Sequence, residues 1–344
     1  MKPWVIPTPI YKEKIWGGTK LKSFRSHVSS SQVGESWELS DFEGEFSVLE
    51  DGKTFREFWS ANPAQILGQR FRDAKRFPLL VKIIDAKEKL SVQVHPDDAY
   101  ALRYDPASQG KKECWYVLDH EQNAEIVVGF AKDISKEEYA KLIEQNQAET
   151  PLRTWKVSNE ECFLILPGTI HAIGGGNLLL EVQQNSDSTY RVYDYGRLGD
   201  DGKPRALHLQ KSLDVLDFSK STGKEKQSPT PLEPIPLLGA KNLSEQASRS
   251  LLVTTDHFRL EKITWASLQI PTGLELPTLP SNPNCFRILF SLTELELVCG
   301  LHTVSIPKFQ TVFFPAYTTE LGFEKIVVRS HGDESGFILV GSPL

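Results

Sequence analysis

The segment Leu-Ser-Val-Gln-Val-His-Pro occupies residues 90–96. Its polar and apolar residues alternate, which is typical of a β-strand with one polar face. Ser91, Gln93 and His95 would then share that face, and the side chains of Gln93 and His95 could direct two ligand atoms at one point. Pro96 ends the pattern because it has no N–H to donate to a sheet. Residues 90–96 alone do not distinguish a ligand-binding strand from one whose polar face meets water.

Similar short apolar segments recur along the chain. They are rich in Val, Ile, Leu and Phe and end at Gly, Pro, Asn or Asp, and examples are residues 46–49, 79–84, 115–118, 126–130, 162–166 and 178–183. Regular short strands separated by turn residues predict a β-sandwich or a β-barrel. Helical patterns are few and occur at residues 54–67, 135–145 and 206–216. The chain is therefore predicted to be mainly β.

One stretch reads as a connector between domains. Residues 219–239 contain Ser, Thr and Lys together with four prolines, a composition that buries little surface and favours an extended chain. We therefore predict a larger β domain with helical additions at residues 1–235 and a smaller all-β domain at residues 236–344. The histidines of the smaller domain lie in no metal motif, which predicts a structural role for it; they are His257, His302 and His331.

Two later segments supply side chains that could join His95 at one metal ion. Glu113 follows His95 at a separation that allows a loop and a return on a neighbouring strand. A Pro-Gly turn signal then precedes His171, at the start of another strand. Imidazole nitrogens with carboxylate and amide oxygens suit Zn²⁺, with Fe, Mn, Co or Ni as alternatives. A set of Gln93, His95, Glu113 and His171 has no thiolate, so it predicts an open catalytic site instead of a closed structural one.

The order of these motifs resembles that of the cupin superfamily. More narrowly, it resembles the mannose-6-phosphate isomerase (phosphomannose isomerase) family in its compact bacterial form. The resemblance runs from about residue 3 to 218 and rests on segments in the family's order: IWGG at 15–18, GESWE at 34–38, LSVQVHPDD at 90–98, KE at 112–113, LPGTIHA at 166–172 and SDSTYRVYD at 186–194. It implies a cupin-type jelly-roll β-barrel with a few helices and a second, smaller all-β cupin-like domain.

Members of this family interconvert mannose 6-phosphate and fructose 6-phosphate through a cis-enediol. The resemblance implies one Zn²⁺ per chain, held by His95, Glu113 and His171, with Gln93 as a fourth and weaker ligand. The metal would act as a Lewis acid on the developing enediolate. Arg191 matches the catalytic arginine of the family, and its fixed charge could stabilise an enediolate oxygen or orient the open sugar.

The resemblance also implies roles for several other charged residues. Glu181 matches an acidic position and could act as the catalytic base, with a metal-bound hydroxide or a histidine as alternatives. Lys82 and Lys111 match lysines that line the family's pocket, so we expect them to contact the phosphate or the hydroxyl groups of the substrate. Arg197 and Lys211 are further candidates for binding the phosphate.

Composition narrows the possible partners. The chain has 344 residues and a formal net charge of −6, which disfavours a general nucleic-acid binder. It has no apolar run of the roughly 18–20 residues that a membrane helix needs, no apparent signal peptide and no C-x-x-C pair among four cysteines. We therefore expect a cytoplasmic protein with reduced thiols. The family resemblance implies a phosphosugar substrate. Whether it is a monomer or a homodimer is left open.

Two other functions have to be weighed against the isomerase. A metal cupin of different chemistry, such as an iron-dependent oxygenase, usually has three histidines with the carboxylate, and here Gln93 stands in place of the first. A non-catalytic sugar-phosphate-binding cupin is expected to lack Glu113, His171 or Arg191, all of which are present. The sequence therefore favours a zinc-dependent aldose–ketose isomerase.

Overall fold

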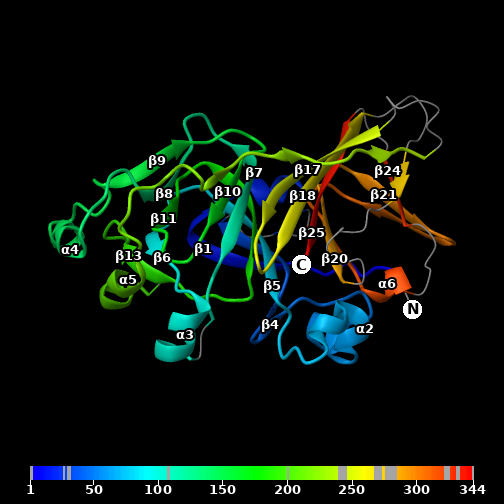
Figure 1. Cartoon of the computed structure of the whole chain (residues 1–344), viewed down its shortest axis with the longest axis horizontal. Helices are drawn as coiled ribbons and strands as arrows, with labels where there is room; N and C mark the ends of the chain where they lie inside the picture. The colour runs from blue at the N-terminus through cyan, green and yellow to red at the C-terminus, as the bar shows by residue number, and fades with distance from the viewer. Residues whose placement is uncertain are drawn as a thin grey trace. The chain divides into compact units, whose positions relative to one another are not determined.

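The structure is a computed structural model, and it describes residues 3–25, 28, 32–106, 109–199, 201–238, 246–266, 273–275, 285–320, 326–330 and 334–342. Figure 1 shows the helices and strands along the chain. Strands predominate and helices are short, which confirms the mainly β prediction. Within the described ranges, no helix is long and apolar enough to cross a membrane.

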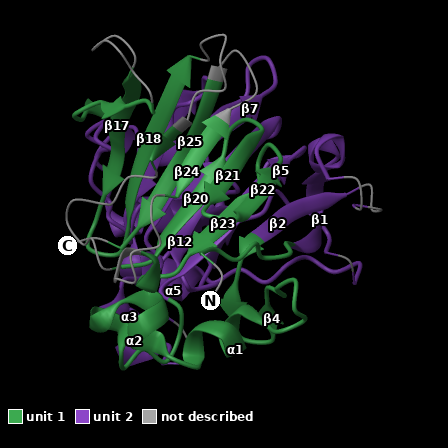
Figure 2. Cartoon of the chain, turned by 90° about the vertical axis from the view of Figure 1, so that its right-hand side faces the viewer, with its two compact units in different colours: residues 1–9, 38–77, 228–344 green, residues 10–37, 78–227 purple. Residues whose placement is uncertain are grey.

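Packing divides the chain into two compact units, which Figure 2 colours separately. Unit 1 contains residues 1–9, 38–77 and 228–344, and unit 2 contains residues 10–37 and 78–227. These units differ from the division expected near residue 235. Residues 38–77, which that division would place in the first domain, pack with the C-terminal part of the chain.

Unit 2 is built on two antiparallel sheets. The larger has the order β1-β2-β5-β12-β7-β10-β14, with bounds Ile10–Gly18, Val33–Leu39, Leu79–Ala86, Asn177–Gln184, Glu113–His120, Cys162–Ile165 and Lys226–Gln227. The smaller has the order β13-β6-β11-β8-β9, with bounds Tyr190–Tyr193, Val92–Val94, His171–Ile173, Glu125–Phe130 and Leu152–Lys156. Apolar side chains of both sheets form one core, among them Ile84, Trp115, Val128 and Ile173. This arrangement agrees with the sandwich or barrel expected from the short strands.

The two central strands of the larger sheet carry charged residues into the protein interior. β5 and β12 are buried along all eight of their residues, as their runs of Leu, Val and Ile require. Their antiparallel register places Glu181 opposite Lys82, and on its other side Glu181 lies opposite Trp115 of β7. Buried charges persist in proteins when they are paired, so this register already indicates a functional region.

The helices of unit 2 lie at the ends of strands and are α3 (Asp98–Tyr104), α4 (Lys136–Glu144) and α5 (Leu209–Val215), with the 3-10 helix η1 (Lys20–Ser23). The sequence predicts α4 and α5 with slightly wider bounds. The Ser135 side chain caps α4 by accepting a hydrogen bond from the backbone N–H of Glu138 at 3.0 Å. α3 begins in the same way, because the Asp97 carboxylate accepts from the N–H of Tyr100.

Unit 1 also contains two main antiparallel sheets. One has the order β15-β17-β18-β25-β20-β23, with bounds Thr230–Pro231, Gln246–Thr254, Arg259–Ala266, Glu334–Gly341, Arg287–Ser291 and Thr311–Phe314; β16 (Ile235–Pro236) also pairs with β17. The other has the order β19-β24-β21-β22, with bounds Gly273–Glu275, Val327–Ser330, Leu295–Cys299 and His302–Ile306. The remaining elements are β3 (Asp41–Phe42), β4 (Glu45–Phe46), α1 (Phe55–Ser60), α2 (Pro63–Leu67), η2 (Gln69–Phe71) and α6 (Tyr317–Glu320).

Aromatic packing explains why residues 38–77 belong to unit 1. The ring of Phe55 lies 5.1 Å from that of Phe313, and the ring of Phe77 lies 4.9 Å from that of Phe286, measured between ring centroids. All four side chains are fully buried. The contacts join segments more than 200 positions apart in the sequence, so local patterns could not predict them.

The predicted helix at residues 54–67 is two helices. Pro63 has no N–H to continue α1, and the Asn62 side chain accepts a hydrogen bond from the N–H of Gln65 to start α2. The proline-rich stretch after residue 219 contains a turn at residues 223–225 followed by three short strands. It is also ordered, because β14 joins the larger sheet of unit 2 while β15 and β16 pair with β17 in unit 1.

Candidate functional site

Three buried side chains of unit 2 converge on one point. His95 follows β6 directly, Glu113 begins β7 and His171 begins β11. The Nε2 atoms of the two imidazoles are 3.1 Å apart, and they lie 3.4 and 3.6 Å from the two carboxylate oxygens of Glu113. Among the residues that the structure describes, this is the one cluster of His, Cys, Asp or Glu that could hold a metal ion.

Backbone contacts hold the two histidines in place. The Pro-Gly turn before His171 is formed as predicted, with Gly168 at φ +84° and the N–H of Gly168 donating to the carbonyl of His95 at 2.9 Å. The Nδ1 of His171 lies 2.8 Å from the carbonyl of Thr169. An Nδ1–H donating to that carbonyl leaves Nε2 as the free lone pair, which is the usual arrangement of a metal-binding histidine.

The electrostatics of the cluster favour the forms that bind metals. Burial lowers the pKa of His95 to about 3, with the nearby Lys111 ammonium adding to the effect, and burial also lowers the pKa of His171. Burial opposes ionisation of Glu113, but the Lys111 ammonium at 2.8 Å together with His95 and His171 outweighs it and holds the pKa of Glu113 well below its ordinary value. Two neutral imidazoles and one carboxylate are therefore present at neutral pH, and these are the ligand forms that a divalent cation requires.

Gln93 and a polar cavity lie next to this cluster. In the β ladder Gln93 pairs with His171 on one side and with Arg191 on the other. A cavity of about 290 Å³ is lined by Gln93, Lys82, Lys111, Glu181 and Arg191 together with Lys14, Trp16, Glu35, Ile84, Leu90, Ser91, Ile173, Asp187, Thr189 and Arg205. The structure thus brings five of the predicted site residues to one cavity, beside the three that form the cluster.

The interior wall of the cavity is a network of paired charges. The Lys82 ammonium lies 3.3 Å from the Glu181 carboxylate, whose other oxygen accepts a hydrogen bond from the indole of Trp115 at 3.1 Å. Burial disfavours the charged form of Lys82, but Glu181 and Glu35 outweigh it and raise the pKa of Lys82. Burial, reinforced by the charge of Glu113, raises the pKa of Glu181. A carboxyl group with a raised pKa in a cavity is suited to proton transfer.

A second carboxylate on the same wall was not predicted. Glu35 accepts a hydrogen bond from the Trp37 indole at 2.7 Å, and the Lys14 ammonium lies 3.3 Å from its other oxygen. The partner of Glu35, Lys14, could have been found from the sequence. Lys14 lies two residues before Trp16 on β1, so the two side chains share one face of the strand, and both line the cavity.

The cavity lining also includes two guanidinium groups, those of Arg191 and Arg205. Arg191 on β13 donates to the carbonyl of Ala206 at 2.9 Å and to the Ser91 hydroxyl at 3.3 Å. Two of the phosphate candidates lie elsewhere. Lys211 is paired with Asp105 at 2.9 Å, and Arg197 is paired with Asp194, and neither belongs to the described lining of the cavity.

A family model and a curated relative place the chain among known proteins. Residues 7–132 match the model of the phosphomannose isomerase type I catalytic domain. Over 226 residues the chain is 40% identical to the mannose-6-phosphate isomerase of Streptococcus mutans, an alignment that covers 64% of this chain and 69% of that protein. The chain belongs to the mannose-6-phosphate isomerase family. This confirms the resemblance inferred from the motifs.

Other members of the mannose-6-phosphate isomerase family extend the comparison. The chain is 44% identical over 213 residues to the mannose-6-phosphate isomerase ManA of Bacillus subtilis, covering 61% of this chain and spanning 66% of the length of ManA. The crystal structure of the mannose 6-phosphate isomerase from Bacillus subtilis is similar in fold along nearly the whole chain, with a TM-score of 0.83, 29% identity and coverage of 98% of this chain and 99% of that one. The cupin-type fold is thereby confirmed.

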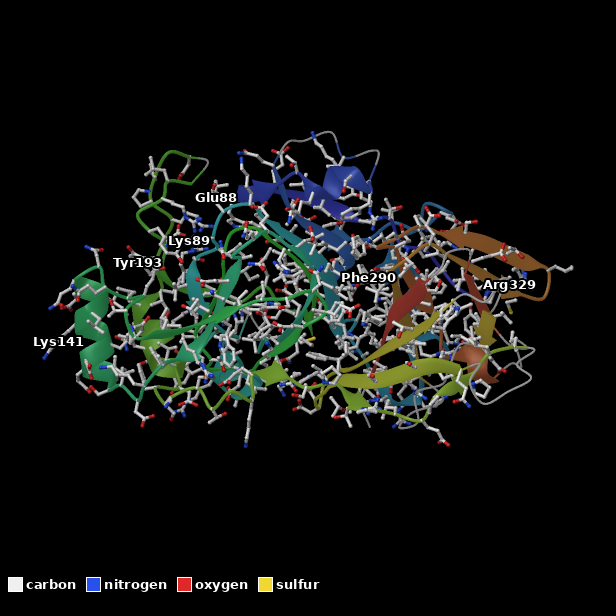
Figure 3. All side chains as sticks on the ribbon, turned by 90° about the horizontal axis from the view of Figure 1, so that it is seen from above. Glu88, Lys89, Lys141, Tyr193, Phe290 and Arg329 are labelled. Carbon is white, nitrogen blue, oxygen red and sulfur yellow. The ribbon has the colours of Figure 1, made fainter. Side chains whose placement is uncertain are left out.

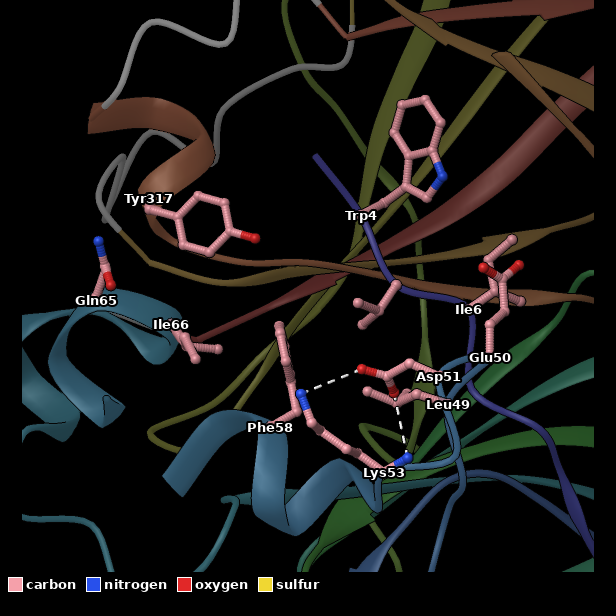
Figure 4. A pocket seen from close by; sticks show the side chains of 11 residues that line it. Trp4, Ile6, Leu49, Glu50, Asp51, Lys53, Phe58, Gln65, Ile66 and Tyr317 are labelled. Carbon is pink, nitrogen blue, oxygen red and sulfur yellow. Dashed lines mark hydrogen bonds and ion pairs between the residues drawn. The ribbon is translucent and has the colours of Figure 1, made fainter. Parts of the chain in front are cut away.

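A different cavity lies in unit 1 and contrasts with the site of this mannose-6-phosphate isomerase family member. It has a volume of about 300 Å³ and an apolar lining that includes Trp4, Phe58 and Tyr317, shown in Figure 4. Its charged residues include Asp51 and Lys53, which pair with each other at 3.3 Å. The described lining holds no histidine or cysteine, and the cluster that could hold a metal ion lies in unit 2.

Proposed function

We propose that this chain interconverts mannose 6-phosphate and fructose 6-phosphate in the polar cavity of unit 2, with the help of one Zn²⁺ ion. The observation that carries the proposal is the convergence of His95, Glu113 and His171 beside a cavity lined by Glu181 and Arg191. Membership of the mannose-6-phosphate isomerase family supports the same reaction.

The donor set fits a divalent metal ion. His95, His171 and Glu113 would hold it, and Gln93, their neighbour in the β ladder, is the proposed fourth ligand. Two nitrogens and two oxygens without a thiolate suit Zn²⁺ in a site with open positions. When bound, the ion supplies Lewis acidity that stabilises negative charge developing on the sugar oxygens.

We assign the proton transfer between C1 and C2 to Glu181. Its carboxylate lines the cavity and is held by Lys82 and Trp115, so its orientation is fixed before the substrate arrives. Its raised pKa lets the same group accept a proton from one carbon and return it to the other.

The cations of the cavity have complementary roles in this proposal. Arg191 carries a permanent charge with a planar set of donors and would stabilise an enediolate oxygen or orient the open chain. Lys111 lies between the cluster and the cavity, within 2.8 Å of Glu113, and would contact a substrate hydroxyl. Lys82 is committed to Glu181 and Glu35, so we assign it mainly to orienting the base.

The two units have separate tasks in this proposal. All proposed ligands and catalytic residues belong to unit 2, and we assign a structural role to unit 1. The cysteines that the structure describes, Cys114, Cys162, Cys285 and Cys299, are buried, and we expect them to remain reduced thiols in a cytoplasmic setting.

A coupled assay for fructose 6-phosphate tests the function. The purified protein should convert mannose 6-phosphate, lose activity on treatment with a chelator and regain it with Zn²⁺, while glucose 6-phosphate serves as the comparison substrate. Metal content is measured on the same samples. An inactive protein with a full complement of metal would overturn the proposal, and oxygen uptake in that protein would point to an oxygenase instead.

A further inference from the structure

Two arginines bind a single carboxylate, and a third arginine lies near them. Asp194, directly after β13, accepts hydrogen bonds from Arg197 at 2.6 Å and from the Nε of Arg205 at 2.7 Å. Arg191 lies close enough to this group that both other guanidiniums act on it electrostatically. Of these arginines, Arg191 and Arg205 line the cavity.

This arginine cluster, Arg191, Arg197 and Arg205 with Asp194, carries an excess of positive charge. Burial lowers the pKa of Arg191, and the charge of Arg205 lowers it further, with Asp194 providing only partial relief. Cations held together around one carboxylate attract an anion into the space beside them. A phosphate monoester carries a charge of about −1.5 to −2 at pH 7 and accepts hydrogen bonds on three oxygens, so it matches this excess.

The lysines of the cavity offer no comparable excess. Each has a carboxylate of its own within 3.3 Å: Lys14 pairs with Glu35, Lys82 with Glu181 and Lys111 with Glu113. On the arginine side, Arg197 and Arg205 share the one carboxylate of Asp194 and Arg191 adds a third positive charge, so these side chains leave an excess of positive charge. This uneven distribution of charge along the cavity lining can orient an anionic ligand.

We propose that Arg205, positioned by Asp194, binds the phosphate group of the substrate and so fixes which end of the sugar faces the metal cluster. The inference rests on the proposed isomerase function and adds a specificity-determining residue to it. Arg191 lines the same cavity, and Gln93 pairs with it on one side and with His171 on the other, so its fixed charge would reach the oxygens nearer the reacting carbons. Neither Arg205 nor Asp194 was a candidate from the sequence.

The loop that carries Arg205 is fastened to the body of unit 2. The guanidinium of Arg197 donates to the carbonyl of Lys89, and the Lys89 ammonium lies 3.6 Å from the centre of the Tyr195 ring. Tyr193 packs against Tyr195, and Lys89 and Tyr193 are both labelled in Figure 3. A side chain on a fastened loop keeps its direction, which a specificity residue requires.

Kinetics of Arg205→Ala test the contact. We expect its KM for mannose 6-phosphate to rise about 10- to 100-fold, the loss typical of a charge-assisted hydrogen bond, while kcat changes little. Arg205→Lys should recover part of the loss. Lys211→Ala removes the same charge outside the described lining and serves as the control. An unchanged KM in Arg205→Ala, or an equal rise in Lys211→Ala, would overturn the proposal.

The substitution Asp194→Asn tests whether Asp194 positions Arg205, because a positioning role and a purely electrostatic role predict changes of KM in opposite directions. The substitution makes the arginine cluster more positive, so attraction by charge alone would lower KM. Loss of the carboxylate that orients Arg205 would instead raise KM. We expect KM to rise, and a lower KM would show that Asp194 does not position Arg205. Circular dichroism and thermal unfolding confirm that the variant is folded.

A calorimetric titration with inorganic phosphate separates this inference from the isomerase reaction. The wild-type protein should bind phosphate, and Arg205→Ala should bind it about tenfold or more weakly. If the wild-type protein binds phosphate in this way but produces no fructose 6-phosphate, the proposed reaction fails and the anion site stands. If isomerase activity is present but phosphate binds both proteins equally, the anion site fails.

Discussion

Individual residues decide the chemistry of the cluster, and their types were visible in the sequence. His95, Glu113 and His171 stand in motifs whose spacing and turn signals predict their convergence. Arg205 and Lys14 stand outside these motifs. They reach the cavity through a loop and an edge strand, whose paths depend on tertiary contacts such as the bond from Arg197 to the carbonyl of Lys89.

The proposed division of roles predicts different losses for different variants. His95→Ala and Glu113→Ala should lose bound metal and activity together, because each removes a donor from a fully buried set. Arg191→Ala should keep the metal and lower kcat by about 100-fold or more. Metal analysis beside steady-state kinetics measures both, with His120→Ala as a control. Loss of metal in Arg191→Ala would contradict the separation.

The buried histidines predict a pH dependence for the metal-free protein. The unfolded chain protonates His95 near pH 6.5 but the folded chain only near pH 3, so the unfolded state binds more protons between these values. The free energy of unfolding should therefore fall as the pH drops below 6.5, by about 1.4 kcal/mol from His95 at pH 5.5. Urea unfolding at pH 7.5 and 5.5 measures it. His95→Asn should flatten the dependence, and an equally steep one would refute this origin.

At the scale of elements, the strands were easier to predict than the pairing of one strand with another. Alternation and apolar runs identified β5, β6, β7 and β12, because the pattern of each strand depends only on its own residues. The pairing of β5 with β12, which buries Lys82 against Glu181, joins segments far apart in the sequence. The break between α1 and α2 was missed because the apolar spacing continues across Asn62 and Pro63.

β8 and the end of β11 approach each other closely at Gly174, so we expect a side chain at this position to destabilise the fold. A Cβ on Gly174 would lie 2.1 Å from the carbonyl oxygen of Glu125, and that oxygen already accepts hydrogen bonds from Gly174 and from the Asn177 side chain. Gly174→Ala should therefore destabilise unit 2 by about 1–3 kcal/mol. Chemical denaturation measures it. Gly199→Ala, whose Cβ would meet nothing nearer than 3.4 Å, is the matched control, and equal losses would contradict the steric explanation.

For the whole molecule, the mainly β class and the family followed from the sequence, but the course of the chain between the units did not. The proline-rich stretch suggested one boundary, whereas residues 38–77 pack with residues 228–344 in unit 1. The reason is the aromatic packing of Phe55 and Phe77, which an apolar pattern cannot assign to one partner over another.

A truncation tests this organisation. A chain that ends at residue 235 lacks Phe286 and Phe313, so the rings of Phe55 and Phe77 lose the partners that bury them. Such a chain should expose aromatic surface and aggregate, while the full chain stays soluble. Size-exclusion chromatography and dye binding measure the difference. A monodisperse truncated chain with cooperative unfolding would instead support an independent domain at residues 1–235.

Because unit 1 is made of three separate segments of the chain, the two units can fold only in a certain order during translation. All of unit 2 has been synthesised once residue 227 emerges, so its sheets can close while translation continues. The segment at 38–77 must wait until Phe286 and Phe313 appear, with its aromatic side chains uncovered for the time it takes to add more than 200 residues. This waiting segment is where a nascent chain would most need a chaperone.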